Sequence, residues 1–285
     1  VMYWNRTIFS NAGLAVPPKY WSDFYNLSQT LTIKDGALNV TQSTVALGEY
    51  VNVSHAMDII SLLIMQAGGA ISSMTYDGFF DSTISDNRGA SIVPAVSAVS
   101  FFTEFVNPLK PFYSWNRSLP MSKNHFIAGD LAVYFGYASE VREIQNKNPN
   151  INFDVAKMPQ SKDAKEIITF GKMSALAVSK ASRNPGVAMQ AGLLLVSKPV
   201  LTELIALTSL PPVRKDMLAV RPSDAYMSMF YESAVQSRAW ISPNKKEVDN
   251  IFREMVESVT GNRRSISDSV NRADLELENL FKKIK

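Results

Sequence analysis

The chain has 285 residues, of which 46% are hydrophobic and 19% are charged. This balance is ordinary for a globular protein that buries a core, and the length suits one large or two medium domains. The formal net charge is +3 and the basic residues are scattered, which argues against nucleic acid as a partner. The absence of cysteine excludes thiol catalysis, disulfides and Cys-bound metal. No stretch reaches the ~18 apolar residues that a membrane-spanning helix needs.

Apolar runs separated by polar, glycine-rich or proline-containing breaks organise the first half of the chain. Trp21, Phe24 and Leu27 recur at three-residue spacing, which is typical of one helix face. Ser54 is a suitable N-cap for a following helix. The predicted elements are a strand at residues 1–4, a helical turn at 7–12, a helix at 20–32, a loop at 35–44, a helix at 54–67, a loop or small hairpin at 72–87 and a helix at 92–106.

The second half shows equally clear helix starts. Asn184 followed by Pro185 combines a capping side chain with proline at the first helical position, and Ser265 with Asp268 resembles a capping box. The predicted elements are an aromatic loop at residues 111–120, helices at 122–129 and 139–147, strands at 131–135, 152–156 and 174–178, helices at 184–197 and 201–207, and a final helix from 265. Because helices alternate with short apolar strands, the predicted fold class is α/β.

Motifs for catalysis, metal binding or cofactor binding are missing from the sequence. It contains two histidines, His55 and His125, and neither belongs to a zinc, nucleophile-elbow or phosphate-loop pattern. His55 lies near Glu49 and Asp58, but the local sequence offers too few ligands for a metal site. We therefore interpret both histidines as structural and predict no catalytic residue, metal or cofactor.

Several segments, read in order, carry a family resemblance. Residues 2–21 contain the pattern Tyr-Trp-Asn, Ala-Gly-Leu and Pro-Pro-Lys-Tyr-Trp, and residues 126–136 read Phe-Ile-Ala-Gly-Asp-Leu-Ala-Val-Tyr-Phe-Gly. Residues 152–159 and residues 176–185 follow, the latter reading Leu-Ala-Val-Ser-Lys before Asn-Pro. Together these segments resemble family 1 of the bacterial extracellular solute-binding proteins, the maltose-binding-protein-like sugar receptors of ABC importers.

The resemblance implies a periplasmic-binding-protein-like fold of type II. Two α/β lobes joined by crossover strands would close around a solute by a hinge motion. Relative to the family, about a hundred residues before Met2 are missing, so the N-terminal lobe is expected to be incomplete in this chain. The implied division is a crossover strand at residues 1–6, the first part of the C-terminal lobe at 7–160, a remaining N-terminal-lobe portion at 161–208 and the returning C-terminal lobe with terminal helices at 209–285.

The resemblance also suggests where a sugar would bind, because aromatic rings stack on its flat faces while carboxylates and amides bond its hydroxyls. The loop at residues 111–120 offers an aromatic cluster, and the end of the strand at residues 131–135 offers a second group. Residues 49–52 and 240 lie where members of the family contact their solute, and residues 170–172 follow an expected crossover. The predicted ligand-binding residues are Tyr113, Trp115, Asn116, Phe135, Tyr137, Ser139, Glu140, Glu49, Asn52, Phe170, Lys172 and Trp240.

The implied function is an extracytoplasmic receptor that binds a small solute, first of all a carbohydrate, and passes it to the membrane permease of an ABC importer. It would be a monomeric, non-enzymatic lipoprotein in the periplasm or on the outer face of the cell membrane, anchored through a missing N-terminus. One alternative keeps the fold but binds a peptide, polyamine or metal chelate. Others are a glycoside hydrolase, which needs two carboxyls ~5–9 Å apart, and a pure interaction module.

Overall fold

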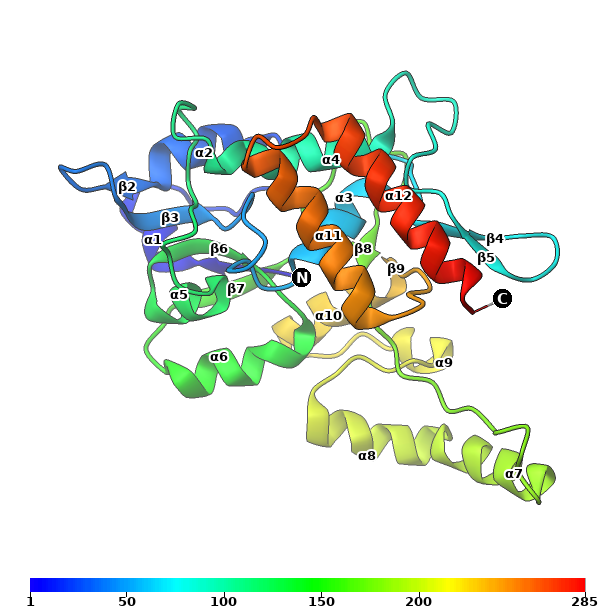
Figure 1. The fold of residues 1–285 in the computed structure, drawn as a ribbon. Coiled ribbons are helices and arrows are strands. Elements are labelled where there is room, and N and C mark those ends of the chain that lie inside the picture. Colours follow the sequence, from blue (N-terminus) through cyan, green and yellow to red (C-terminus); the bar gives the residue numbers. More distant parts are fainter. Residues whose placement is uncertain (285) are drawn as a thin grey trace.

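A five-stranded mixed sheet forms the centre of the main body (Figure 1). This computed structural model describes residues 1–284, so Lys285, the end of the predicted segment 209–285, lies outside the described residues. The strand order is β2-β3-β6-β1-β7. β1 runs antiparallel to both β6 and β7, whereas β3 runs parallel to β6. The strands are β1 (Met2–Asn5), β2 (Ile33–Lys34), β3 (Val40–Val45), β6 (Leu131–Phe135) and β7 (Phe153–Ala156).

Helices cover the sheet, and two small sheets flank it. A hairpin joins β4 (Ser72–Met74) to β5 (Phe80–Ser82), and β8 (Thr169–Phe170) pairs in parallel with β9 (Ser237–Arg238). The helices of the main body are α1 (Arg6–Asn11), α2 (Asp23–Leu31), α3 (Ala56–Gln66), α4 (Pro94–Thr103), α5 (Ser122–Ala128), α6 (Val141–Lys147), α10 (Ala225–Val235), α11 (Lys245–Thr260) and α12 (Ile266–Lys282), with 3₁₀ turns η1 (Glu104–Val106) and η2 (Ala138–Glu140).

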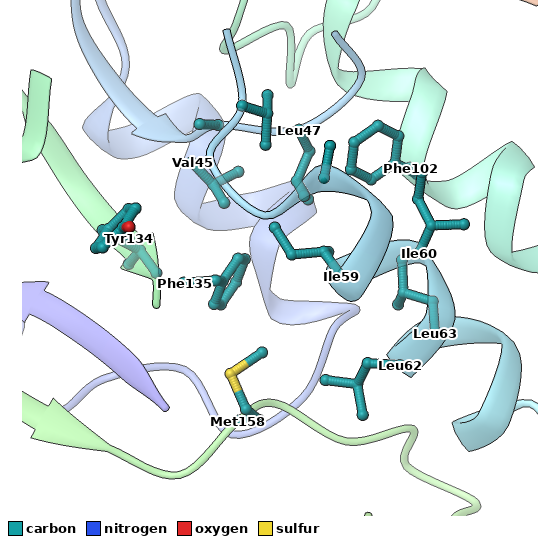
Figure 2. Close-up of a cluster of buried hydrophobic side chains, with 14 of the residues drawn as sticks. Val45, Leu47, Ile59, Ile60, Leu62, Leu63, Phe102, Tyr134, Phe135 and Met158 are labelled. Atoms are coloured by element: carbon teal, nitrogen blue, oxygen red, sulfur yellow. The ribbon is translucent and has the colours of Figure 1, made fainter. Parts of the chain in front are cut away.

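The hydrophobic core lies between β6 and the helices α3 and α4. All five residues of β6 are buried, as expected for a central strand covered on both faces. Ile59 and Leu62 of α3 lie close to Phe135 at the end of β6 and to Met158 after β7 (Figure 2). The core thus reaches the carboxyl end of β6, and the residues that follow this strand emerge beside α3.

Two helices project from this body. In Figure 1, α7 (Pro185–Leu195) and α8 (Lys198–Thr208) lie apart from the central sheet, with the short α9 (Lys215–Leu218) between them and α10. Leu201 is the one buried residue of α7 and α8. Among residues 1–284 no single helix is long and apolar enough to cross a membrane; α7 and α8 together suffice by length and composition, although they bend by 53° at their junction. The exposed apolar residues of the two helices are Val187, Met189, Leu193, Leu194, Leu195, Val200, Leu204 and Leu207.

Most predicted elements are confirmed, with two corrections. The predicted loop at residues 35–44 contains most of β3. The strand is rich in polar residues, so its sequence does not resemble that of a buried strand. Its backbone is nevertheless satisfied in the interior, because the Ser114 hydroxyl accepts from the N–H groups of Thr44 and Val45 at 3.1 Å each. The predicted strand at residues 174–178 is wrong for this structure, because the segment is exposed and no strand lies beside it to accept its hydrogen bonds.

Candidate functional site

Two backbone features bring the end of β6 against the start of α3. Gly136 follows β6 where a Cβ atom would collide with the Glu140 carboxylate and lie 2.6 Å from the Tyr134 ring, so only glycine fits there. His55 caps α3 in the left-handed region, with φ of 62°, which costs free energy for a non-glycine residue. As a result, the rings of His55 and Tyr137 meet edge to face with centroids 4.9 Å apart.

An open pocket of about 310 Å³, including its solvent-filled mouth, lies at this junction. Its floor is apolar, and Figure 2 shows Ile59, Leu62, Phe135 and Met158 converging there. Tyr137 lines the pocket beside them. Ligands of α/β sheets commonly bind where strands end, and this pocket lies at such a place. The complete lining is Val1, His55, Asp58, Ile59, Leu62, Phe135, Gly136, Tyr137, Met158 and Phe170.

Phe170 reaches the pocket because the chain after β7 is tied back onto α3. The Gln66 side chain at the end of α3 donates to the carbonyls of Pro159 and Ile168, at 3.0 and 2.8 Å. The Ile168 N–H in turn donates to the side chain of Gln160 at 3.0 Å. These bonds fix the approach of β8, which carries Phe170. The pocket is therefore built from parts of the chain that are far apart in the sequence: Val1, the first half of α3, residues 135–137, Met158 and Phe170.

A buried carboxylate, Glu140, supports the pocket from behind. It accepts the Tyr137 backbone N–H at 2.8 Å and the Tyr134 hydroxyl at 3.1 Å, and it bonds His55 Nε2 at 3.0 Å. Lys123 Nζ lies 3.3 Å away. Burial by itself raises the pKa of Glu140, but the hydrogen bond and charge of His55, the Tyr137 N–H and the Lys123 charge outweigh it and lower the pKa to about 2. Glu140 is thus an ionised anchor for His55 and Tyr137.

A second buried carboxylate, Asp58, lines the pocket itself and is 5% exposed. Its Oδ2 accepts from the Tyr137 hydroxyl at 2.7 Å and from Lys172 Nζ at 2.6 Å, and it lies 3.7 Å from His55 Nδ1. Among residues 1–284, its Oδ1 has no hydrogen-bond partner. Burial, together with the Asp58 charge and hydrogen bond, keeps the pKa of Tyr137 well above its ordinary value, so the phenol stays neutral and donates.

Five of the predicted ligand-binding residues gather around this pocket. Phe135, Tyr137 and Phe170 line it. Lys172 lies over the Tyr137 ring at 4.9 Å from the centroid, and Glu140 bonds the Tyr137 backbone from behind. These residues form one aromatic and polar group although they come from different segments.

Two predicted ligand-binding residues, Trp115 and Asn52, are buried in this structure and bond each other. Trp115 is 0% exposed, and its Nε1 donates to Asn52 Oδ1 at 3.0 Å. Asn52 is also buried, and its side-chain nitrogen donates to the carbonyls of Asn116 and Leu119 at 2.9 and 3.0 Å. All of these groups are occupied within the protein, so the two side chains hold the 111–120 loop on the body instead of contacting a solute.

The remaining predicted residues do not line the pocket. The Tyr113 hydroxyl accepts from the Asn116 side chain at 2.8 Å, and Glu49 pairs with Arg117 at 3.1 Å on the surface. Ser139 is exposed on η2. These positions do not combine with Tyr137 into one aromatic wall.

Trp240 packs against α3 but does not line the pocket. Its Nε1 donates to Ser61 of α3 at 3.2 Å, and its ring stacks on Phe252 with centroids 6.1 Å apart. The same helix therefore has two roles: Ser61 bonds Trp240, while Asp58, Ile59 and Leu62 line the pocket.

Sequence reasoning missed His55 and Asp58 as pocket residues. Their three-residue spacing places both at the first turn of α3, and this spacing was the signal available in the sequence. The carboxylate partner of His55 and the phenol partner of Asp58 lie 85 and 79 residues away along the chain, so no local pattern indicated the cluster.

Comparison with known proteins agrees with this architecture. The family model for bacterial extracellular solute-binding proteins matches residues 1–191, and no curated protein matches. Similar solved structures include an ABC-transporter solute-binding protein of Thermotoga lettingae with tagatose (18% identity, TM-score 0.67, 99% of this chain and 70% of that chain). Two more are a cyclic maltosyl-maltose binding protein of Arthrobacter globiformis (17%, 0.71, 99% and 70%) and a cyclo/maltodextrin-binding protein with maltotetraose (15%, 0.75, 100% and 69%).

These identities establish the shared fold, and the family match, which covers about two thirds of the chain, establishes kinship. The mixed α/β architecture is therefore that of the periplasmic solute-binding proteins, as predicted. The chain belongs to the family of bacterial extracellular solute-binding proteins.

Proposed function

We propose that the full-length protein is the receptor of an ABC importer and binds a carbohydrate in the pocket between β6 and α3, without chemical turnover. The observation that carries this proposal is the combination of Phe135, Tyr137 and Phe170 with the buried carboxylate of Asp58 around one open pocket. Aromatic faces suit the C–H faces of a sugar ring, and a carboxylate accepts hydrogen bonds from its hydroxyls. The three similar structures named above are all complexes with, or binders of, saccharides.

The proposal includes a second lobe that closes on the pocket. Residues 161–208 would form part of it, with residues 1–6 as a crossover and residues 7–160 and 209–285 as the first lobe. The exposed apolar side chains of α7 and α8 support this division, because a helix face of this kind packs against other protein surface. Closure would bring further contacts to the solute. The permease would then receive the solute from the closed receptor.

The same proposal places the protein outside the cytoplasmic membrane as a lipid-anchored monomer. Calorimetric titration of the full-length protein with mono- and oligosaccharides is expected to give saturable one-to-one binding with no product formed. Short peptides, polyamines and metal chelates serve as the comparison panel. Binding of one of these in place of every saccharide would overturn the carbohydrate assignment, and saturable turnover of a saccharide would identify a glycoside hydrolase instead.

Tyr137 is expected to contribute directly to solute affinity. Replacing it with alanine removes the stacking ring and the hydroxyl that donates to Asp58, so the affinity for the sugar should fall by more than ~1 kcal/mol, about fivefold or more. Tyr113→Ala is the matched control, because Tyr113 is half-buried and lies outside the pocket. Calorimetry of both variants measures the difference. Equal losses in the two variants would show that the sugar does not stack on Tyr137.

A further inference from the structure

The ammonium of Lys172 occupies a position that a ligand could take. Its Nζ lies 2.6 Å from Asp58 Oδ2 and 4.9 Å from the centroid of the Tyr137 ring. A cation over an aromatic face and against a carboxylate is the arrangement that proteins use to bind amines. The pocket beside it therefore has the chemistry of an ammonium site, filled at present by a side chain of the same protein.

The contact of Lys172 is easily exchanged. Its side chain is 51% exposed, whereas that of Asp58 is 7% exposed. Because about half of the Lys172 side chain is exposed, its ammonium can turn into solvent without disturbing packed side chains. A soluble amine that also gains pocket contacts can therefore replace Lys172 at small cost. The buried carboxylate would then exchange one cationic partner for another.

Asp58 has unused capacity for such a ligand. Oδ2 already accepts from Tyr137 and Lys172 and lies near His55, but Oδ1 of this 95%-buried residue has no partner. A buried acceptor without a donor is unfavourable. Asp58 lines the pocket, so a donor group of a ligand that enters there meets this carboxylate. An ammonium group carries three N–H donors and can supply one to this carboxylate while keeping another for a second acceptor.

The charges around the pocket favour a cation over a neutral group. Asp58 and Glu140 both lie beside His55; Lys172 pairs with Asp58, while Lys123 is shared between Glu140 and Glu143. When Lys172 leaves, Asp58 has the Tyr137 hydroxyl and the His55 ring as neighbours. Lys172 contacts both Asp58 and the Tyr137 ring, and the ammonium group of a ligand can restore both contacts, whereas a neutral sugar supplies hydrogen bonds alone.

From these contacts we infer that the pocket selects amine-bearing saccharides, whose protonated amino group displaces Lys172 from Asp58 and the Tyr137 ring. This inference rests on the proposed carbohydrate binding and adds the substrate class. Lys172 then acts as an internal substitute for the ligand amine in the unoccupied receptor. Because Lys172 follows β8, its displacement would also release the chain segment that leads to α7.

The test is calorimetry of the full-length protein with matched sugars. Glucosamine and galactosamine and their short oligomers are compared with the N-acetylated sugars and with the neutral glucose and galactose equivalents. The wild type is expected to bind the amino form at least tenfold more tightly than both counterparts. Lys172→Met should strengthen binding of the amino form by several-fold, and Asp58→Asn should remove the preference.

Lys147→Met is the matched control, since Lys147 is similarly exposed, at 54% of its side chain, and forms an ion pair at 2.8 Å with Glu143 away from the pocket. It should leave every affinity unchanged. Equal or tighter binding of the acetylated or neutral sugars by the wild type would overturn this inference while leaving carbohydrate binding intact. Weaker binding of the amino sugars by Lys172→Met would also overturn it, because Lys172 would then be a solute contact. Absence of binding to all of these sugars would overturn the proposed function as well.

Discussion

Replacing Trp115 with alanine is expected to lower the free energy of unfolding by about 3–5 kcal/mol, the usual cost of deleting a large buried aromatic side chain. Trp115 is 0% exposed, packs edge to face on His125 with centroids 5.5 Å apart, and donates its indole N–H to Asn52. The substitution leaves a cavity and an unpaired buried amide oxygen, which together account for the size of the effect. Urea denaturation followed by circular dichroism measures it.

Trp115→Phe separates the two contributions. It keeps most of the ring volume but removes the donor to Asn52 Oδ1, so its loss should lie near the cost of one unsatisfied buried acceptor, about 1–3 kcal/mol. Solute affinity of the folded protein should be unchanged in both variants, because Trp115 does not line the pocket. A variant that is as stable as the wild type but has lost its affinity for the solute would show that Trp115 contacts the solute.

The regular part of the fold could be predicted from the sequence because it follows from local rules. The three-residue spacing of Trp21, Phe24 and Leu27 marks α2. Ser265 caps α12 as predicted, its hydroxyl accepting the Asp268 N–H at 3.1 Å. The apolar run at β6 is also unambiguous, since all of its residues are buried. Each of these signals lies within a short stretch of chain.

Other features depend on what the chain meets in three dimensions. β3 is rich in Thr and Ser, and the hydroxyl that accepts hydrogen bonds from its backbone belongs to Ser114, about 70 residues away. An aromatic residue in a loop, such as Trp115, can equally well be exposed or buried, and the residue that decides this is Asn52. The segment at residues 174–178 has the composition of a strand but lacks a neighbour. Composition alone does not distinguish these cases.

The candidate site was partly predictable for the same reason. Strand ends place side chains at one edge of a sheet, so Phe135 and Tyr137 could be selected as neighbours of a solute. Asp58 could not, because its partners Tyr137 and Lys172 are 79 and 114 residues distant. The left-handed backbone of His55, which turns the start of α3 toward the pocket, has no sequence signal in a non-glycine residue.

Glu140 is expected to stabilise the folded protein strongly, and in a pH-dependent way. The network around it lowers its pKa from 4.5 to about 2. Because the folded-state pKa is depressed, the ionised form adds stability that is fully present above about pH 4.5 and is lost as the pH falls from there toward 2. The lowering corresponds to about 3 kcal/mol. Glu140→Gln, which mimics the protonated form, should therefore reduce the free energy of unfolding by about 3 kcal/mol at pH 7.

The pH dependence distinguishes this electrostatic role from simple packing. The difference between wild type and Glu140→Gln should shrink steadily between pH 5 and pH 2, as measured by urea denaturation at a series of pH values. Glu143→Gln is the matched control: Glu143 also pairs with Lys123, at 2.8 Å, but its side chain is 36% exposed, so the loss should stay within about 1 kcal/mol. A difference for Glu140→Gln that stays constant down to pH 2 would mean that the shape of the side chain matters there and its charge does not. Tyr137 would then be held by the backbone turn at Gly136 and by Asp58.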